Sequence, residues 1–100
     1  MDVESVKTKI REGKFRFSLH AEMEAEADNL DIAQVIQAIL RGEILEQYPD
    51  TGRGESCLIV GFAGSTPIHT VCGTRANNLI IVTVYIPGPP KFIDPWTRAG

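Results

Sequence analysis

Two histidines are the side chains in this chain best suited to acid–base chemistry, and His20 is the more informative of them. It follows Ser18, a good N-cap residue, so it lies in the first turn of a predicted helix. The positive end of the helix macrodipole disfavours a cation there, which favours a neutral imidazole that accepts a proton. Glu24, one turn later, favours the cation instead. The alternative interpretation is a structural histidine bonded to a backbone carbonyl.

His69, Thr83 and Tyr85 are the other candidates, and they fall on two predicted strands joined by a tight turn at residues 76–78. A two-residue or four-residue loop pairs Cys72 with Thr83 and turns His69 to the apolar face of the sheet. A three-residue loop places His69 opposite Tyr85. The sequence leaves both registers open, and a catalytic role for His69 requires the second.

If these side chains share a face with His20, the site contains two bases, a hydroxyl and a phenol, a set that could catalyse RNA cleavage by the 2′-hydroxyl. In RNA cleavage by the 2′-hydroxyl, a base removes the hydroxyl proton and an acid protonates the leaving oxygen. Positive charge must stabilise the phosphorane. The candidate cations for binding the substrate phosphate are Arg75, Arg53, Arg16 and Lys14. Each of them also has the ordinary interpretation of a solvated surface charge.

Other kinds of site find little support in the sequence. There is no glycine-rich phosphate loop at a strand-to-helix junction and no G-x-S-x-G motif. The histidines and cysteines lack the paired spacing of a zinc site, so we expect neither a metal nor another cofactor. Cys57 and Cys72 are interpreted as reduced, packed thiols.

Composition favours one globular domain. The chain has 100 residues, 43% of them hydrophobic and 23% charged, with a net charge of −3. That charge argues against broad nucleic-acid binding, although residues 7–16 carry five bases against one acid. Residues 22–31 carry five acids and no base. Without an apolar run long enough to span a membrane or a recognisable leader, we expect a cytoplasmic protein.

The hydrophobic periods predict an α+β domain in which two to three N-terminal helices pack on one face of a four-stranded antiparallel sheet. The helices fall within about residues 2–41, the antiparallel strands within about 43–86, and an irregular tail covers 87–100. Residues 15–17 are expected to form an extended link. In the last strand, the side carrying Ile80, Val82, Val84 and Ile86 is expected to face the helices. Phe92, Ile93 and Trp96 are expected to dock the tail on the body.

The pattern resembles the bacterial family known as domain of unknown function 4258. The resemblance covers about residues 6 to 96 and rests on five segments: Phe17-Ser18-Leu19-His20-Ala21, residues 31–42, Ile44 to Pro49, Pro67 to Val71, and Ile80 to Tyr85 followed by Trp96. That family is similar to the RelE and BrnT toxins of toxin–antitoxin pairs, small ribonucleases held inactive by a partner protein. The resemblance implies a helix-flanked antiparallel sheet and His20, His69, Thr83 and Tyr85 as characteristic positions. It implies an antitoxin and an RNA as partners, and the chain is also compatible with a homodimer.

One departure from the family pattern supports a second hypothesis. Members of the family carry basic residues in the helix after the His-Ala pair, whereas residues 22–30 here contain none. Such an acidic face repels RNA. The alternative function is therefore a non-catalytic protein-interaction module that binds a partner through its acidic helix and an exposed hairpin edge.

Overall fold

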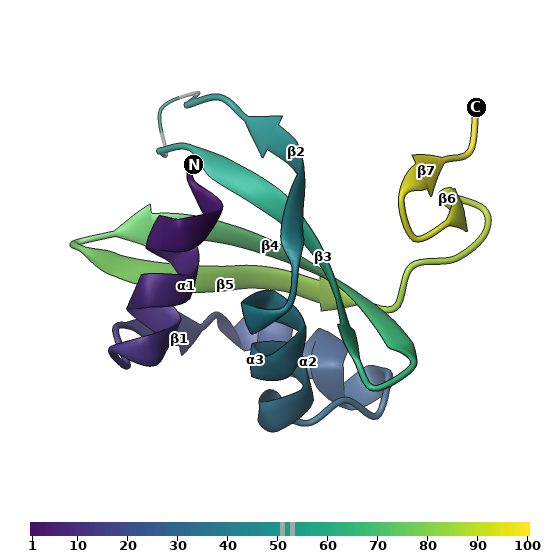
Figure 1. The fold of residues 1–100 in the computed structure, drawn as a ribbon, viewed down its shortest axis with the longest axis horizontal. Helices are drawn as coiled ribbons and strands as arrows, with labels where there is room; N and C mark the ends of the chain where they lie inside the picture. The colour runs from purple at the N-terminus through teal and green to yellow at the C-terminus, as the bar shows by residue number, and fades with distance from the viewer. Residues whose placement is uncertain (51, 53) are drawn as a thin grey trace.

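The computed structural model describes residues 1–50, 52 and 54–100, and three short helices lie together on one side of a sheet (Figure 1). The helices are α1 (Val3–Arg11), α2 (Leu19–Ala27) and α3 (Ile32–Leu40). Each begins at a side chain that accepts a hydrogen bond from the first turn: Asp2, Ser18 and Asp31. At α3 a capping box forms, because Gln34 N donates to the Asp31 carboxylate at 2.7 Å and Asp31 N donates to the Gln34 side chain at 2.9 Å.

The main sheet has five strands in the order β1-β5-β4-β3-β2, and a separate two-stranded sheet forms from β6 and β7. The strands are β1 (Phe15–Phe17), β2 (Glu43–Tyr48), β3 (Ser56–Ala63), β4 (Thr66–Arg75), β5 (Asn78–Tyr85), β6 (Phe92–Asp94) and β7 (Thr97–Arg98). The α+β class is confirmed, and neighbours from β2 to β5 are antiparallel as expected. The expected four-stranded antiparallel sheet is wrong, since β1 pairs with β5 in parallel and makes the sheet mixed. A three-residue segment is too short to show a hydrophobic period, so only its tertiary pairing reveals it as a strand.

A bulge decides which way the side chains of β4 and β5 point. The hairpin turn contains two residues, Ala76 and Asn77, with φ of 50° and 66°. On its own that turn sets the even register. The pairing then shifts between Val71 and Cys72, which leaves Val82 of β5 without a partner residue. Beyond the bulge His69 lies opposite Tyr85.

The bulge also corrects the predicted face of β5. Val84 is buried toward the helices as expected, but Val82 and Ile86 are exposed. Leu79 and Ile81 are fully buried in the helix-side core instead. One inserted residue exchanges the two faces of a strand, because its side-chain period is two. Thr83 and Tyr85 face away from the helices.

Polar side chains of α2 and of its two cap residues form hydrogen bonds with the backbone at the edge of β5. β1 covers β5 only at Leu79–Ile81, so the rest of that edge needs other partners. The Ser18 hydroxyl donates to the Val82 carbonyl at 3.0 Å, and Val84 N donates to the Glu24 carboxylate at 3.1 Å. Ile86 N donates in the same way to Asp28 at 3.0 Å. Two of the five acids in residues 22–31, Glu24 and Asp28, therefore accept hydrogen bonds from backbone N–H groups of the β5 edge.

Removing one of these carboxylates should destabilise the domain. We expect Glu24→Ala to lower the free energy of unfolding by about 1–2 kcal/mol, because the Val84 N–H loses its acceptor in a partly buried place. Glu26→Ala is the matched control, since Glu26 is exposed on the same helix. Urea denaturation followed by circular dichroism compares the two variants. Equal stability of both would contradict the proposed edge contact.

Candidate functional site

His69 lies on β4 with its side chain on the sheet face away from the helices, and it is fully buried. Its Nδ1 is 3.1 Å from the Tyr85 hydroxyl, and its Nε2 is 2.6 Å from the carbonyl oxygen of Pro95. A carbonyl only accepts, so Nε2 carries the proton and Nδ1 accepts from the hydroxyl. Burial lowers the pKa of His69 and raises the pKa of Tyr85. Both groups are therefore held in their neutral forms.

A second set of polar side chains lies on the same face. The Glu46 carboxylate accepts two hydrogen bonds from Arg98, from Nε at 2.6 Å and Nη2 at 2.8 Å, in a bidentate pair. It also accepts from the Tyr48 hydroxyl at 2.6 Å. The hydrogen bond from Arg98 is the main cause that lowers the pKa of Glu46 to about 2. Burial, followed by the bond to Glu46, raises the pKa of Tyr48 to about 12.

Phe92 joins the two sets. Its ring meets the His69 imidazole edge-on, with centroids 4.5 Å apart, and the Arg98 guanidinium lies 4.9 Å from the centre of the same ring. Phe92 is 1% exposed. The five side chains His69, Tyr85, Glu46, Tyr48 and Arg98 are called the His69 cluster below.

The C-terminal hairpin, residues 87–98, covers this cluster. The expected irregular tail instead contains the small β6–β7 sheet, which lies apart from the helices (Figure 1). Phe92 docks as predicted, and Trp96 packs on Phe62 with ring centroids 5.8 Å apart. The prediction for Ile93 is wrong, because that side chain is 70% exposed. Two aromatic rings and one arginine therefore hold the hairpin in place.

The sequence-predicted acid–base residues divide into two places. Thr83 is on the same sheet face as His69 and Tyr85, two residue pairs along, opposite Val71. His20 does not join them: its ring is 69% exposed on α2, with Nε2 3.2 Å from the Glu24 carboxylate. The expected convergence of His20 with the strand residues is thus not seen, because the Ser18 cap sets the helix at the edge of β5 rather than over the sheet face.

Three of the four predicted cations, Arg75, Arg16 and Lys14, lie toward the end of the sheet opposite to His69. Arg75 sits at the β4–β5 turn, where six residues of strand at roughly 3.3 Å each separate it from His69 by about 20 Å. Arg16 on β1 and Lys14 just before it lie near the same end of the sheet, and Lys14 is 3.6 Å from Glu12. Arg53 lies outside the described residues. Among the residues that the structure describes, Arg98 is the arginine best placed for the role predicted for those cations, which is to bind the substrate phosphate.

Sequence reasoning missed Glu46, Tyr48 and Arg98 as site residues. Glu46 stands on the same face as Tyr48 and His69 only because β2 has a register shift between Ile44 and Glu46. Arg98 comes from a segment with no hydrophobic period. The aromatic and basic composition of the last ten residues was the one available signal.

The Glu46–Arg98 pair and His69 should make stability pH-dependent. The pKa of Glu46 falls from its usual 4.5 to about 2, so its contribution is complete above about 4.5 and is lost as the pH falls toward 2. Because the Arg98 side chain is 53% exposed, we discount this contribution to about 1–2 kcal/mol. The lowered pKa of His69 adds a loss that begins as the pH falls below 6.5.

Urea unfolding of the parent chain and of Glu46→Gln checks this window. We expect the parent to be more stable by about 1–2 kcal/mol near neutral pH and the difference to close in strong acid, where both side chains are uncharged. A difference that stayed constant down to about pH 2 would show that the ion pair is not its source.

The cysteines, the candidate metal ligands and the hydrophobicity of the helices are the remaining features of the sequence that bear on the kind of protein. Cys57 and Cys72 are free, buried and directly opposite each other on β3 and β4, and burial raises the pKa of Cys57 to about 11. Within residues 1–50, 52 and 54–100 there is no group of three or more His, Cys, Asp or Glu side chains that could hold a metal ion. No helix in the described chain is long and apolar enough to cross a membrane.

A family model described as "Domain of unknown function (DUF4258)" matches residues 17–86 of this chain. The chain belongs to the DUF4258 family. Four members of the His69 cluster lie inside the matched region, namely Glu46, Tyr48, His69 and Tyr85. Arg98, with the hairpin that covers the cluster, lies beyond the DUF4258 match. Neither the curated proteins nor the solved structures gave a match to the chain.

Proposed function

We propose that this DUF4258 chain is a toxin-like domain of the RelE and BrnT type, a metal-independent ribonuclease that an antitoxin protein holds inactive. The observation that carries the proposal is the 3.1 Å contact between His69 and Tyr85 on the sheet face away from the helices, beneath the C-terminal hairpin. It joins a neutral imidazole to a neutral phenol, which are the base and the acid that cleavage by the 2′-hydroxyl requires. A cytoplasmic location is part of the same proposal, since RNA is the proposed substrate.

In the proposed reaction, His69 and Tyr85 exchange protons with the substrate and return to their starting protonation states. His69 Nδ1 removes the proton from the ribose 2′-hydroxyl while the 2′-oxygen attacks phosphorus. The bond from phosphorus to the 5′-oxygen breaks, and Tyr85 protonates that leaving oxygen. The imidazolium then returns its proton to the tyrosinate across the 3.1 Å contact, which restores both groups. Thr83, on the same face, would contact the ribose or the phosphate.

Arg98 is our candidate for the phosphate ligand, because Arg75, Arg16 and Lys14 lie too far from His69 to fill that role. A guanidinium matches the geometry of a phosphorane, as it matches the Glu46 carboxylate here. His69 is fully buried, so the proposal includes movement of the C-terminal hairpin to admit RNA. The contacts that must break are the bond from His69 to Pro95, the Arg98–Glu46 pair and the packing of Phe92.

Incubation of the purified chain with single-stranded RNA at low salt tests the proposal. We expect cleavage in the presence of a chelator, with products that end in a 2′,3′-cyclic phosphate, because the 2′-oxygen is the nucleophile. Intact RNA at enzyme concentrations equal to the substrate would contradict it. Products bearing a 3′-hydroxyl would show a different mechanism.

A further inference from the structure

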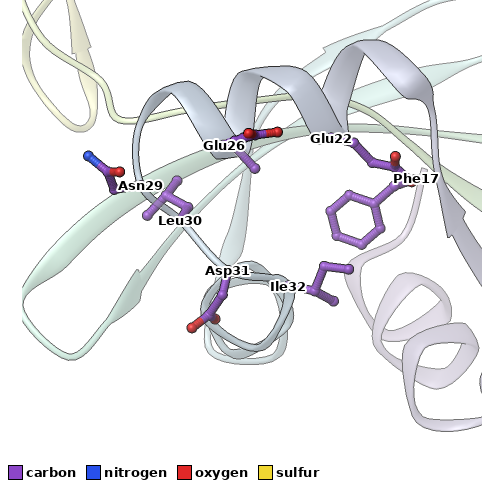
Figure 2. Close-up of a pocket in the computed structure, with 8 residues that line it drawn as sticks. Phe17, Glu22, Glu26, Asn29, Leu30, Asp31 and Ile32 are labelled. Carbon is purple, nitrogen blue, oxygen red and sulfur yellow. The ribbon is translucent and has the colours of Figure 1, made fainter.

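An open groove lies on the helix side of the molecule, away from the His69 cluster. It runs between the second half of α2 and the start of α3 and has a volume of about 580 Å³. Phe17, Leu30 and Ile32 provide its apolar lining, and Glu22, Glu26 and Asp31 bring carboxylates to it. Figure 2 shows the Phe17 ring and the Ile32 side chain facing the same space beneath α2.

The apolar surface continues beyond the groove. Leu19 is 72% exposed, Met23 62% and Ile32 56%. Leu19 and Met23 are one helical turn apart, on the same side of α2 as the groove residues Glu22 and Glu26. Exposed apolar side chains that lie together at a groove are typical of a binding surface. A single partner can bury all of them at once, whereas scattered apolar side chains are normal on any protein surface.

The charged side chains that line the groove are all acidic. Residues 17–40 contain five acids and neither lysine nor arginine. Glu24 and Asp28 are used by the edge of β5, which leaves the other three at the groove. None of the ion pairs found among the described residues involves Glu22, Glu26 or Asp31. An occupant with positive charge would therefore meet unneutralised carboxylates at the groove.

We propose that this groove binds a basic amphipathic helix of a partner protein. The apolar side chains of that helix, spaced at i, i+3, i+4 and i+7, would cover Phe17, Leu30 and Ile32, and its flanking Lys and Arg would pair with Glu22 and Glu26. The groove lies mainly between α2 and α3, and its one strand residue, Phe17, belongs to a strand of only three residues, which favours a helix over an added strand as the occupant. The proposal does not depend on ribonuclease activity.

Titration of the ¹⁵N-labelled full chain with two designed peptides tests this surface. The first peptide is helical, with leucines at i, i+3, i+4 and i+7 and flanking Lys and Arg; the second carries Glu at every basic position. We expect the basic peptide alone to shift the amide signals of Phe17, Glu22, Glu26 and Ile32. Shifts of equal size with both peptides, shifts confined to other surfaces, or no binding by either peptide would overturn the proposal.

Charge reversal on the chain supplies the matched variants. We expect Glu22→Lys combined with Glu26→Lys to weaken binding of the basic peptide by about tenfold or more, while Glu43→Lys, at an exposed acid on β2, changes it by less than about twofold. Circular dichroism confirms that each variant is folded. Unchanged affinity in the double variant would overturn the proposal. A concentration-dependent dimer that Ile32→Ser dissociates would assign the groove to a second copy of the chain instead.

Discussion

Gly61→Ala is expected to cost more than about 4 kcal/mol of the roughly 5–15 kcal/mol by which a domain of this size is stable. A Cβ at Gly61 would lie 1.9 Å from the carbonyl oxygen of Ala38 and 2.7 Å from its carbonyl carbon. Both are backbone atoms of α3, so no side-chain rotation relieves the overlap. Gly42 makes a similar approach, where an added Cβ would lie 2.7 Å from the carbonyl oxygen of Val60.

The substitution tests how the helix layer meets the sheet. The contact puts the end of α3 directly on β3, which positions the helix-side core around Val35, Ile39 and Ile59. Gly88→Ala is the control, because an added Cβ there has no atom within 4 Å. Thermal and urea unfolding of both variants measures the difference. A loss below about 1 kcal/mol for Gly61→Ala would show that α3 does not lie this close to β3.

Much of the helical part of the fold could be predicted from the sequence, because its signals are local. Ser18 caps a helix where expected, and the apolar residues between 32 and 40 follow the helical spacing of α3, the helix with the most buried residues. The parallel strand β1 could not be predicted, since three residues carry no period and the pairing partner lies more than 60 positions away. The small β6–β7 sheet escaped prediction because its strands, of three and two residues, are also too short to show a hydrophobic period.

The position of the site residues depends on two shifts in strand register that the sequence does not reveal, one between β4 and β5 and one between β2 and β3. The two-residue turn at Ala76–Asn77 favours the even register, and only the bulge at Val82 restores the pairing of His69 with Tyr85. The shift beside Leu45 similarly sets the face of Glu46. Single-sequence patterns assume an unbroken alternation, so they miss side chains whose placement depends on its interruption.

The second large effect is expected in catalysis. His69→Gln should reduce RNA cleavage by at least about 100-fold, the lower end of what a positioned general base contributes. The glutamine amide can still donate to the Pro95 carbonyl, so the sheet face keeps that contact while it loses the proton acceptor. His20→Gln is the matched control, because the His20 side chain is 69% exposed on α2, where it pairs with Glu24, away from the His69 cluster.

Side-by-side cleavage of one single-stranded RNA by the parent chain, His69→Gln and His20→Gln is the most direct measurement. If the buried imidazole beside Tyr85 is the working base, the parent and His20→Gln cleave at rates within about twofold of each other, and His69→Gln falls by about two orders of magnitude. Folding of each variant is checked by circular dichroism. Equal rates for all three proteins, or a loss confined to His20→Gln, would contradict the assignment of His69.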